Sequence, residues 1–132
     1  MNIISKIGRT PLDMAILKFN QDLIDLFLAQ DKLDINYRGL CGNTSLMTAV
    51  ECGNIEAIKN SLLEREDLDV NIQNKNLSTP LMLAIQNNYK DIVKKLLNHP
   101  KININLKDSD GETALSVSLK HGFFYLSRLL IQ

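Results

Sequence analysis

The chain has 132 residues, 45% of them hydrophobic, and its 15 lysine and arginine residues balance its 15 aspartate and glutamate residues. That is the size of one domain with its own core, and a charged fraction of 23% with abundant Leu and Ile excludes an intrinsically disordered chain. The zero net charge gives no basic surface for nucleic acid or an anionic membrane, no apolar run could cross a bilayer, and residues 1–9 lack the layout of a signal peptide.

A strong internal repeat runs through the sequence. Four segments align, and their threonines Thr10, Thr44, Thr79 and Thr113 lie 34, 35 and 34 residues apart. A second marker keeps the same register, because Asn36, Asn71 and Asn105 each follow Ile or Val and each stand eight residues before the next threonine. Units of this length bury their apolar faces only by stacking, so the repeat predicts a solenoid. We divide the single domain, residues 1–132, into repeats of approximately 2–35, 36–70, 71–104 and 105–132.

Each threonine opens a predicted first helix. Threonine is a good N-cap, and Pro11 and Pro80 occupy the first helical position, where a missing N–H costs nothing. Apolar residues at helical spacing then give one face to bury: Leu12, Ala15, Ile16; Leu46, Ala49, Val50; Leu81, Ala84, Ile85. The helix is expected to end at Cys52-Gly53, Asn87-Asn88 or His121-Gly122.

A second apolar stripe predicts a second helix in each repeat. Its members are Leu23, Ile24, Phe27, Leu28; Ala57, Ile58, Leu62; Ile92, Val93, Leu96, Leu97; and Leu126, Leu130, Ile131. A short extended piece such as residues 33–36 and a turn such as Asp110-Gly111 lead to the next threonine. The unit is therefore helix, turn, helix and a long hairpin-like loop.

These motifs resemble the ankyrin repeat family. The family pattern Gly-x-Thr-Pro-Leu-x-x-Ala is intact from Gly8 to Ala15, and residues 91–97, Asp-Ile-Val-Lys-Lys-Leu-Leu, are close to the second-helix pattern of the family. The resemblance covers nearly all of the chain. It implies an all-α ankyrin-repeat solenoid of stacked helix-turn-helix units with hairpin-like loops.

Several positions depart from the family pattern. The repeats are one or two residues longer than the usual 33, and we expect the extra residues in the loop after each second helix. Leu77 replaces a turn glycine that normally has positive φ, so either Asn76 adopts that conformation or the turn changes type. Asp13, Met47, Met82 and Ser116 replace the family histidine, and we expect its hydrogen bonds between loops to be missing.

The residues that could carry chemistry are scattered. Cys41 and Cys52 are eleven positions apart, without the close pairing of a zinc or redox motif, and both are interpreted as reduced thiols. A metal site formed by these cysteines with His121 is the alternative. His99 stands in a loop and His121 at a helix end, where the helix dipole favours it. We therefore expect no catalytic site, no metal and no cofactor.

The stacked repeats are expected to form a concave face of loop tips and first helices. In the family such positions commonly contact partner proteins. Transferred by register, they are Tyr37, Arg38, Leu40, Cys41, Asn43, Glu51, Cys52, Gln73, Lys75, Asn76, Ser78, Gln86, Asn87, Lys107, Ser109, Asp110, Glu112, Lys120 and His121. Tyr37 and Arg38 share one loop, and interface hot spots favour both residue types.

The leading functional hypothesis is a non-enzymatic, cytoplasmic scaffold that binds another protein through its concave face. One alternative is a regulatory or targeting segment of a larger multidomain enzyme, and another is a secreted bacterial effector acting in the host cytoplasm. Phe123, Phe124 and Leu129 make the C-terminal end unusually apolar. We expect self-association or further repeats there, and the competing interpretation is that the aromatic rings fold back on the preceding helices.

Overall fold

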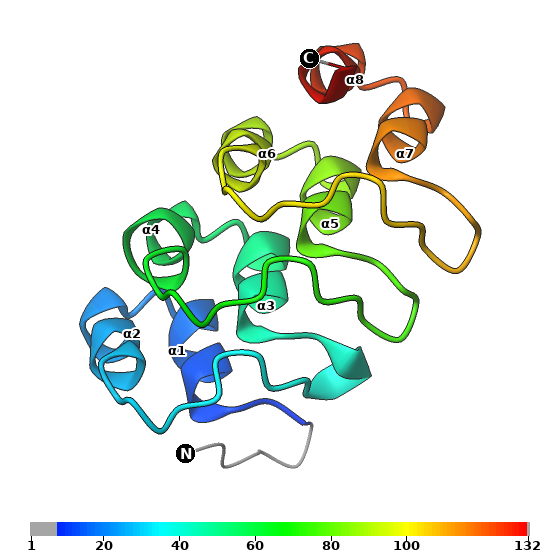
Figure 1. Ribbon diagram of the computed structural model, residues 1–132. Coiled ribbons are helices and arrows are strands. Elements are labelled where there is room, and N and C mark those ends of the chain that lie inside the picture. The colour runs from blue at the N-terminus through cyan, green and yellow to red at the C-terminus, as the bar shows by residue number, and fades with distance from the viewer. Residues whose placement is uncertain (1–7, 132) are drawn as a thin grey trace.

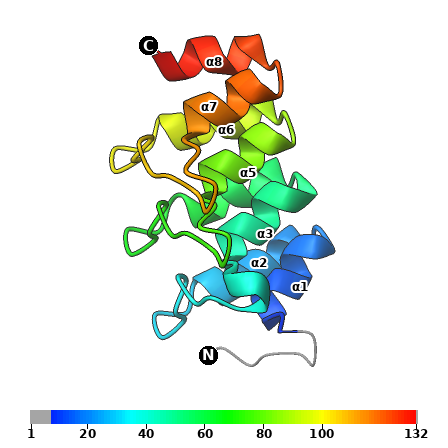
Figure 2. The ribbon, with the colours of Figure 1, turned by 90° about the vertical axis from the view of Figure 1, so that its right-hand side faces the viewer.

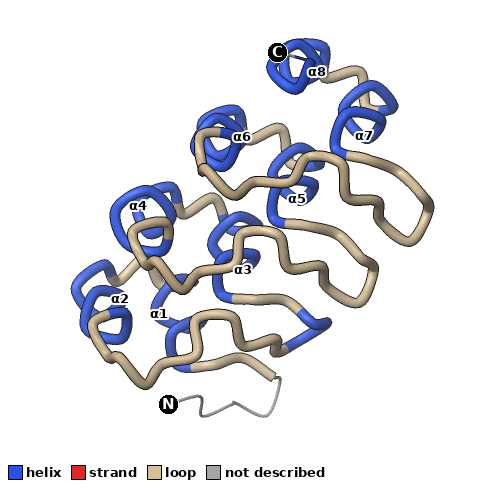
Figure 3. Tube along the Cα trace, in the orientation of Figure 1, coloured by secondary structure: helices blue, strands red, loops and turns tan. Residues whose placement is uncertain are grey.

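The structure is a computed structural model, and it describes residues 8–131. Helices stack in two rows, and long loops project from the inner row (Figures 1 and 3). The inner row consists of α1 (Pro11–Leu17), α3 (Ser45–Cys52), α5 (Pro80–Gln86) and α7 (Ala114–Lys120). The outer row consists of α2 (Gln21–Leu28), α4 (Ile55–Ala57) with the π-helical turn η2 (Ile58–Leu62), α6 (Lys90–Leu97) and α8 (Phe124–Ile131). Within residues 8–131 there is no strand, and the all-α solenoid is confirmed.

The predicted threonine caps begin all four inner helices. Each threonine hydroxyl accepts a hydrogen bond from the backbone N–H three residues later, at 3.1–3.3 Å. These bonds satisfy donors that the first helical turn leaves without partners. The inner helices therefore start in one register and lie one above another in the turned view (Figure 2).

The inner helices also end alike. The residue nine positions after each threonine has positive φ, and the sequence places Phe19, Gly53, Asn88 and Gly122 there. Two backbone N–H groups then return to the carbonyls of the last turn, as Asn54 does to Ala49 at 2.9 Å. The chain reverses within this turn and enters the outer helix.

The predicted apolar faces form a single core that runs through the stack. Ile16, Leu46 and Ile85 are fully buried, as are Ile24, Ile58 and Leu96 from the outer row. The prediction of the outer apolar faces is wrong for one residue in the first repeat and one in the last, because Leu23 and Ile131 are exposed.

The longer second repeat absorbs its additional residue inside a helix. Thr44 and Asn71 are one residue farther apart than Thr10 and Asn36. In η2 the Leu63 N–H donates to the Ile58 carbonyl, a five-residue step that widens the helical turn. For this residue the expectation of an enlarged loop after the helix is wrong, because the loop that follows has the same hydrogen bonds as in the first and third repeats.

Neighbouring loops are joined by the marker asparagines. The Asn36 amide donates to the Asp67 carbonyl at 2.8 Å, and its oxygen accepts from the Asp69 N–H at 2.7 Å. Asn71 repeats this clamp one unit later, to Lys101 at 2.8 Å and Asn103 at 2.9 Å. The second marker of the sequence therefore links each loop to the loop that follows the next outer helix.

Arg65 makes a further link between the first and second repeats. Its guanidinium donates to the carbonyls of Leu28, Gln30 and Leu33, which follow or end α2. The same group pairs with Asp67 at 2.6 Å, and this hydrogen bond lowers the pKa of the Asp67 carboxyl. A cation at this place also suits the negative end of the α2 dipole.

Leu77 itself adopts the left-handed conformation, with φ 59°. Both alternatives offered for this turn are therefore wrong. The equivalent Gly42 and Gly111 have φ 74° and 76°, so the hydrogen bonds of the loop impose this conformation on whichever residue is present. A leucine there carries a steric cost that glycine does not.

We predict that Leu77→Gly raises the free energy of unfolding by about 0.5–1 kcal/mol, because relief of the left-handed strain exceeds the added entropy of the unfolded chain. The matched opposite change is Gly111→Ala. A Cβ at Gly111 would meet no atom within 4 Å, so backbone strain alone should cost about 1 kcal/mol. Urea unfolding measures both, and a destabilising Leu77→Gly would contradict this account.

Candidate functional site

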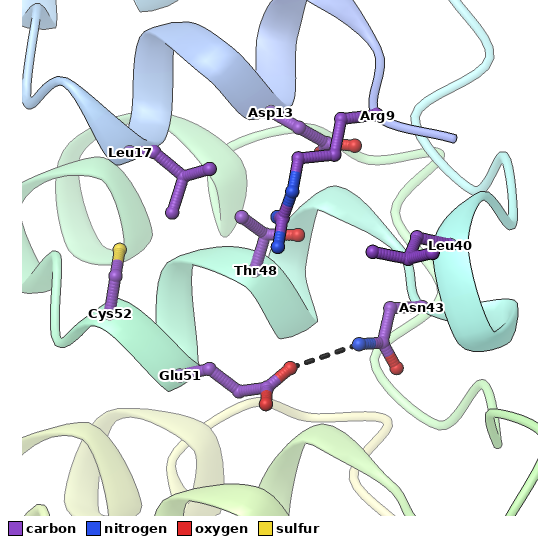
Figure 4. Close-up of a pocket in the computed structure, with 8 residues that line it drawn as sticks. All are labelled: Arg9, Asp13, Leu17, Leu40, Asn43, Thr48, Glu51 and Cys52. Atoms are coloured by element: carbon purple, nitrogen blue, oxygen red, sulfur yellow. Dashed lines mark hydrogen bonds between the residues drawn. The ribbon is translucent and has the colours of Figure 1, made fainter. Parts of the chain in front are cut away.

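The loop tips and inner helices enclose two adjoining hollows, which we call the inner groove. The first has a volume of about 210 Å³ and is lined by Arg9, Asp13, Leu17, Leu40, Asn43, Thr48, Glu51 and Cys52 (Figure 4). The second has a volume of about 490 Å³ and is lined by Cys41, Asn43, Glu51, Asn74, Asn76, Ser78, Leu83, Gln86, Asp108, Ser109 and Asp110. Asn43 and Glu51 line both hollows, so the groove is continuous across the second repeat.

The boundary between the hollows is a chain of polar side chains. Figure 4 shows Asn43 reaching across to Glu51 of α3, and the amide donates to the carboxylate at 2.9 Å. The Asn43 oxygen accepts from the Asn74 amide of the next loop, also at 2.9 Å. These bonds hold two loops against α3 and fix the shape of the groove before any partner arrives.

The tips of the loops have the same internal bonds in the third and fourth repeats. The Asn74 oxygen accepts from the N–H groups of Asn76 and Ser78, each at 3.0 Å. One Asp108 oxygen accepts in the same way from Asp110 and Glu112, each at 2.9 Å. Both side chains therefore shape the groove, although only their neighbours were predicted to line it.

Backbone hydrogen bonds join each tip to the next. Leu40 in the short 3₁₀ turn η1 (Leu40–Gly42) donates from its N–H to the Gly8 carbonyl at 2.9 Å. Lys75 donates to Cys41 at 3.1 Å, and Ser109 donates to Asn76 at 3.0 Å. The four tips thus form one continuous edge along the groove.

Asp13 in the first hollow is a structural carboxylate. It is 5% exposed and accepts from the Thr10 N–H at 3.1 Å and from the Ser45 hydroxyl at 2.6 Å. Ser45 belongs to the next repeat, so this residue links the helices α1 and α3. These bonds hold Asp13 in place against the start of α3.

The second hollow is polar and acidic. It contains the carboxylates of Glu51, Asp108 and Asp110, and none of the described residues that line it is a lysine or arginine. The lysines of α6 lie in the outer row, where Lys90 and Lys94 stand over the Tyr125 ring at 5.4 Å. The second hollow is therefore the acidic part of the groove, whereas Arg9 lines the first hollow.

The structure brings about half of the predicted partner-binding residues together. Those that line the second hollow are Cys41, Asn43, Glu51, Asn76, Ser78, Gln86, Ser109 and Asp110, and Leu40 and Cys52 line the first. Tyr37, Arg38, Gln73, Lys75, Asn87, Lys107, Glu112, Lys120 and His121 line neither hollow.

Several of the predicted residues have structural partners. Ser78 is only 7% exposed, so little of it is open to a partner. The Gln73 amide donates to the carbonyls of Leu77 and Lys107, and the Arg38 Nε donates to the Gly42 carbonyl. His121 hydrogen-bonds to the Val117 carbonyl at 3.0 Å and stacks on Phe123.

Sequence reasoning missed Arg9, Asn74 and Asp108 in the groove. Asn74 and Asp108 are 34 residues apart and stand five positions before a threonine, so the repeat register itself could have found them. Arg9 directly precedes Thr10, the same register position as the predicted Asn43, Ser78 and Glu112, so the register could have found it too.

The groove offers hydrogen-bonding groups and little that is reactive. Within residues 8–131 no group of three or more His, Cys, Asp or Glu side chains is arranged to hold a metal ion. Burial raises the pKa of the Cys52 thiol, which keeps it protonated and a poor nucleophile near neutral pH. Among the described helices, none combines the length and apolarity needed to span a membrane.

Comparisons with known proteins agree with this architecture. A family described as ankyrin repeats in three copies matches residues 46–132, and one described as ankyrin repeats in many copies matches residues 12–59. Alpha-latrotoxin-Lg1a of Latrodectus geometricus is 34% identical over 117 residues, which is 87% of this chain and 8% of the toxin. The human transient receptor potential cation channel subfamily A member 1 is 39% identical over 77 residues, 58% of this chain and 7% of the channel.

A viral protein is also similar. The ankyrin repeat protein FPV031 of fowlpox virus is 34% identical over 128 residues, which cover 92% of this chain and 36% of the viral protein. The chain thus spans less than a tenth of the toxin and the channel, and about a third of the viral protein.

The alkylation rates of the two cysteines test how deeply each is buried in the wall of the groove. We predict that iodoacetamide at pH 8 alkylates exposed Cys41 several-fold faster than half-buried Cys52, whose raised pKa lowers its thiolate fraction. Raising the pH to about 9.5 should speed the Cys52 reaction, and in urea the two rates should converge. Peptide mass spectrometry measures both sites, and equal rates in the folded protein would contradict this placement.

Proposed function

The chain belongs to the ankyrin repeat family, and we propose that it is a non-enzymatic module whose inner groove binds a segment of a partner protein. Ankyrin repeats are generally protein–protein interaction modules. The observation that carries the proposal is the continuous groove whose walls are fixed by bonds from Glu51 through Asn43 to Asn74. A site that is ordered in advance loses less conformational entropy when a partner binds.

The chemistry of the groove indicates the kind of segment that it would receive. Amide groups of Asn76 and Gln86 can donate to and accept from a peptide backbone. The carboxylates of Glu51 and Asp110 suit a lysine or arginine side chain. We therefore propose an extended, basic segment as the partner, bound without a cofactor.

Two features support a non-catalytic role. The ankyrin repeat family is typically non-catalytic. The acidic groups of the groove are largely engaged, since Asp13 and Asp108 accept from backbone N–H groups and Glu51 accepts from Asn43. We also propose a cytoplasmic location, with which ankyrin repeats are compatible, and another protein as the partner.

A second function is favoured by the lengths of the relatives. The chain corresponds to 8% of a toxin and 7% of a channel. We propose as the alternative that it acts as the regulatory or targeting ankyrin segment of a larger protein, with the same groove in contact with its partner.

The groove is tested with the charge-reversal variant Glu51→Lys plus Asp110→Lys. Peptides selected on the parent protein from a random displayed library should be enriched in lysine and arginine. The variant should weaken their binding by about tenfold or more, because like charges now face each other. Isothermal titration with the selected peptides measures the change.

The matched control is Glu64→Lys plus Glu66→Lys, which makes the same change in net charge at exposed residues after η2. This control should bind like the parent, and circular dichroism should show that both variants are folded. Equal binding by the groove variant and the parent, or a loss confined to the control, would overturn the proposed site.

A further inference from the structure

The last repeat presents an open apolar face. Ile104, Leu115, Leu130 and Ile131, with Asn105 and Thr113, surround a hollow of about 370 Å³ at the end of the stack that α7 and α8 form. Ile131 is 70% exposed. A solenoid normally ends in a repeat with a polar outer face, so this surface is not a finished cap.

The same positions in earlier repeats are covered by the repeat that follows. Leu115 corresponds to Leu12, Leu46 and Leu81, which are 2%, 0% and 1% exposed, whereas Leu115 is only half-buried. Ile104 corresponds to Ile35 and Val70, which are buried, and it is also half-buried. The end face therefore presents the apolar residues that each earlier repeat buries against its neighbour. Among the described residues, no following repeat covers them.

A polar residue of the end face also indicates that a further repeat would fit there. Asn36 and Asn71 each donate to a backbone carbonyl and accept from a backbone N–H two residues further on, both in the loop that follows the next outer helix. Asn105 stands at the third such position and is exposed. Among the described residues its side chain has no hydrogen-bond partner, and only its backbone N–H is bonded, to Asn103 at 3.0 Å.

We infer that the end face formed by Ile104, Asn105, Leu115 and Ile131 is a docking surface for one further ankyrin-type repeat. Its apolar residues receive the helices of that repeat, and Asn105 clamps a carbonyl and an N–H of the loop that leads into it. The face continues an interface already present three times in the stack, and the similar toxin and channel are more than ten times longer than the matched segment. The inference does not depend on the function proposed for the inner groove.

The aromatic residues of α8 do not cover this surface. Phe124 is 66% exposed, so the expectation that the rings fold back on the preceding helices is wrong for this residue. Tyr125 is 43% exposed and lies under Lys90 and Lys94 of α6. Phe123 is half-buried and stacks on His121 at a ring distance of 5.5 Å.

The direct test appends a second copy of residues 99–131 after Gln132. The repeat spacing of 34 residues places this copy in register as a fifth repeat. The five-repeat protein should unfold in one transition with a higher urea midpoint than the parent. Asn105→Ala should lower the midpoint of the five-repeat protein and leave that of the parent unchanged.

Two controls separate docking from a general effect of length. Asn98→Ala, an exposed asparagine in the turn after α6, should have the same small effect in both proteins. Ile131→Lys should be tolerated by the parent and should abolish the gain in the five-repeat protein. If the fifth repeat unfolds separately at lower urea, or if Asn105→Ala acts equally on both proteins, the inference is overturned.

A further experiment uses the parent protein without an added repeat. Sedimentation equilibrium up to about 100 µM should show a monomer, because the proposed occupant is a further repeat and not a second copy. Concentration-dependent association that Asn105→Ala abolishes would make a second copy the occupant and would overturn the choice made here. Should the five-repeat protein fail to fold, Ile131→Lys is compared with Leu97→Lys in the parent. Only the half-buried Leu97, which packs against the core, should be sensitive.

Discussion

No helix pair in this chain can bury its own apolar residues, and each depends on the pair that stacks against it. Leu46 of α3 and Leu81 of α5 are buried although each helix has only two turns, because neighbouring repeats enclose them. Polar contacts set the register of this stacking. Asn36 and Asn71 reach carbonyl groups of the next loop, and Arg65 reaches a carbonyl of the preceding repeat. The buried Asn54 amide donates to the Ile16 carbonyl at 3.0 Å. The solenoid is therefore a sum of nearest-neighbour interfaces.

The same constraint produces both surfaces of interest. Side chains at the loop tips are not needed for stacking, so Asn76, Gln86 and Asp110 can line an ordered polar groove. At the end of the array stacking stops, and the residues that would form the next interface remain open around Asn105 and Ile131. The residues of the inner groove are not part of the core. The residues of the end face would be core residues if a further repeat covered them.

Features that depend on one residue and its helix could be predicted from the sequence. The threonine caps and the apolar faces of the inner helices follow from local hydrogen bonding and helical spacing. Features that depend on a neighbouring loop could not. Leu77 is forced to positive φ by bonds in its turn, Ser78 is buried by the same turn, and Asp13 bonds to Ser45 of another repeat. The π-helical turn η2 reflects a choice between widening a helix and lengthening a loop, which composition does not decide.

The central claim is that the asparagine clamps join neighbouring loops of the stack, and amide hydrogen exchange tests it most directly. The N–H groups of Asp69 and Asn103 lie in exposed loops and donate to the side chains of Asn36 and Asn71. Nuclear magnetic resonance should show both amides exchanging far more slowly than the rates of an unstructured peptide, with protection at Asp69 lost in Asn36→Ala and protection at Asn103 retained. Exchange of both amides at unstructured-peptide rates, while the helices remain protected, would contradict the account.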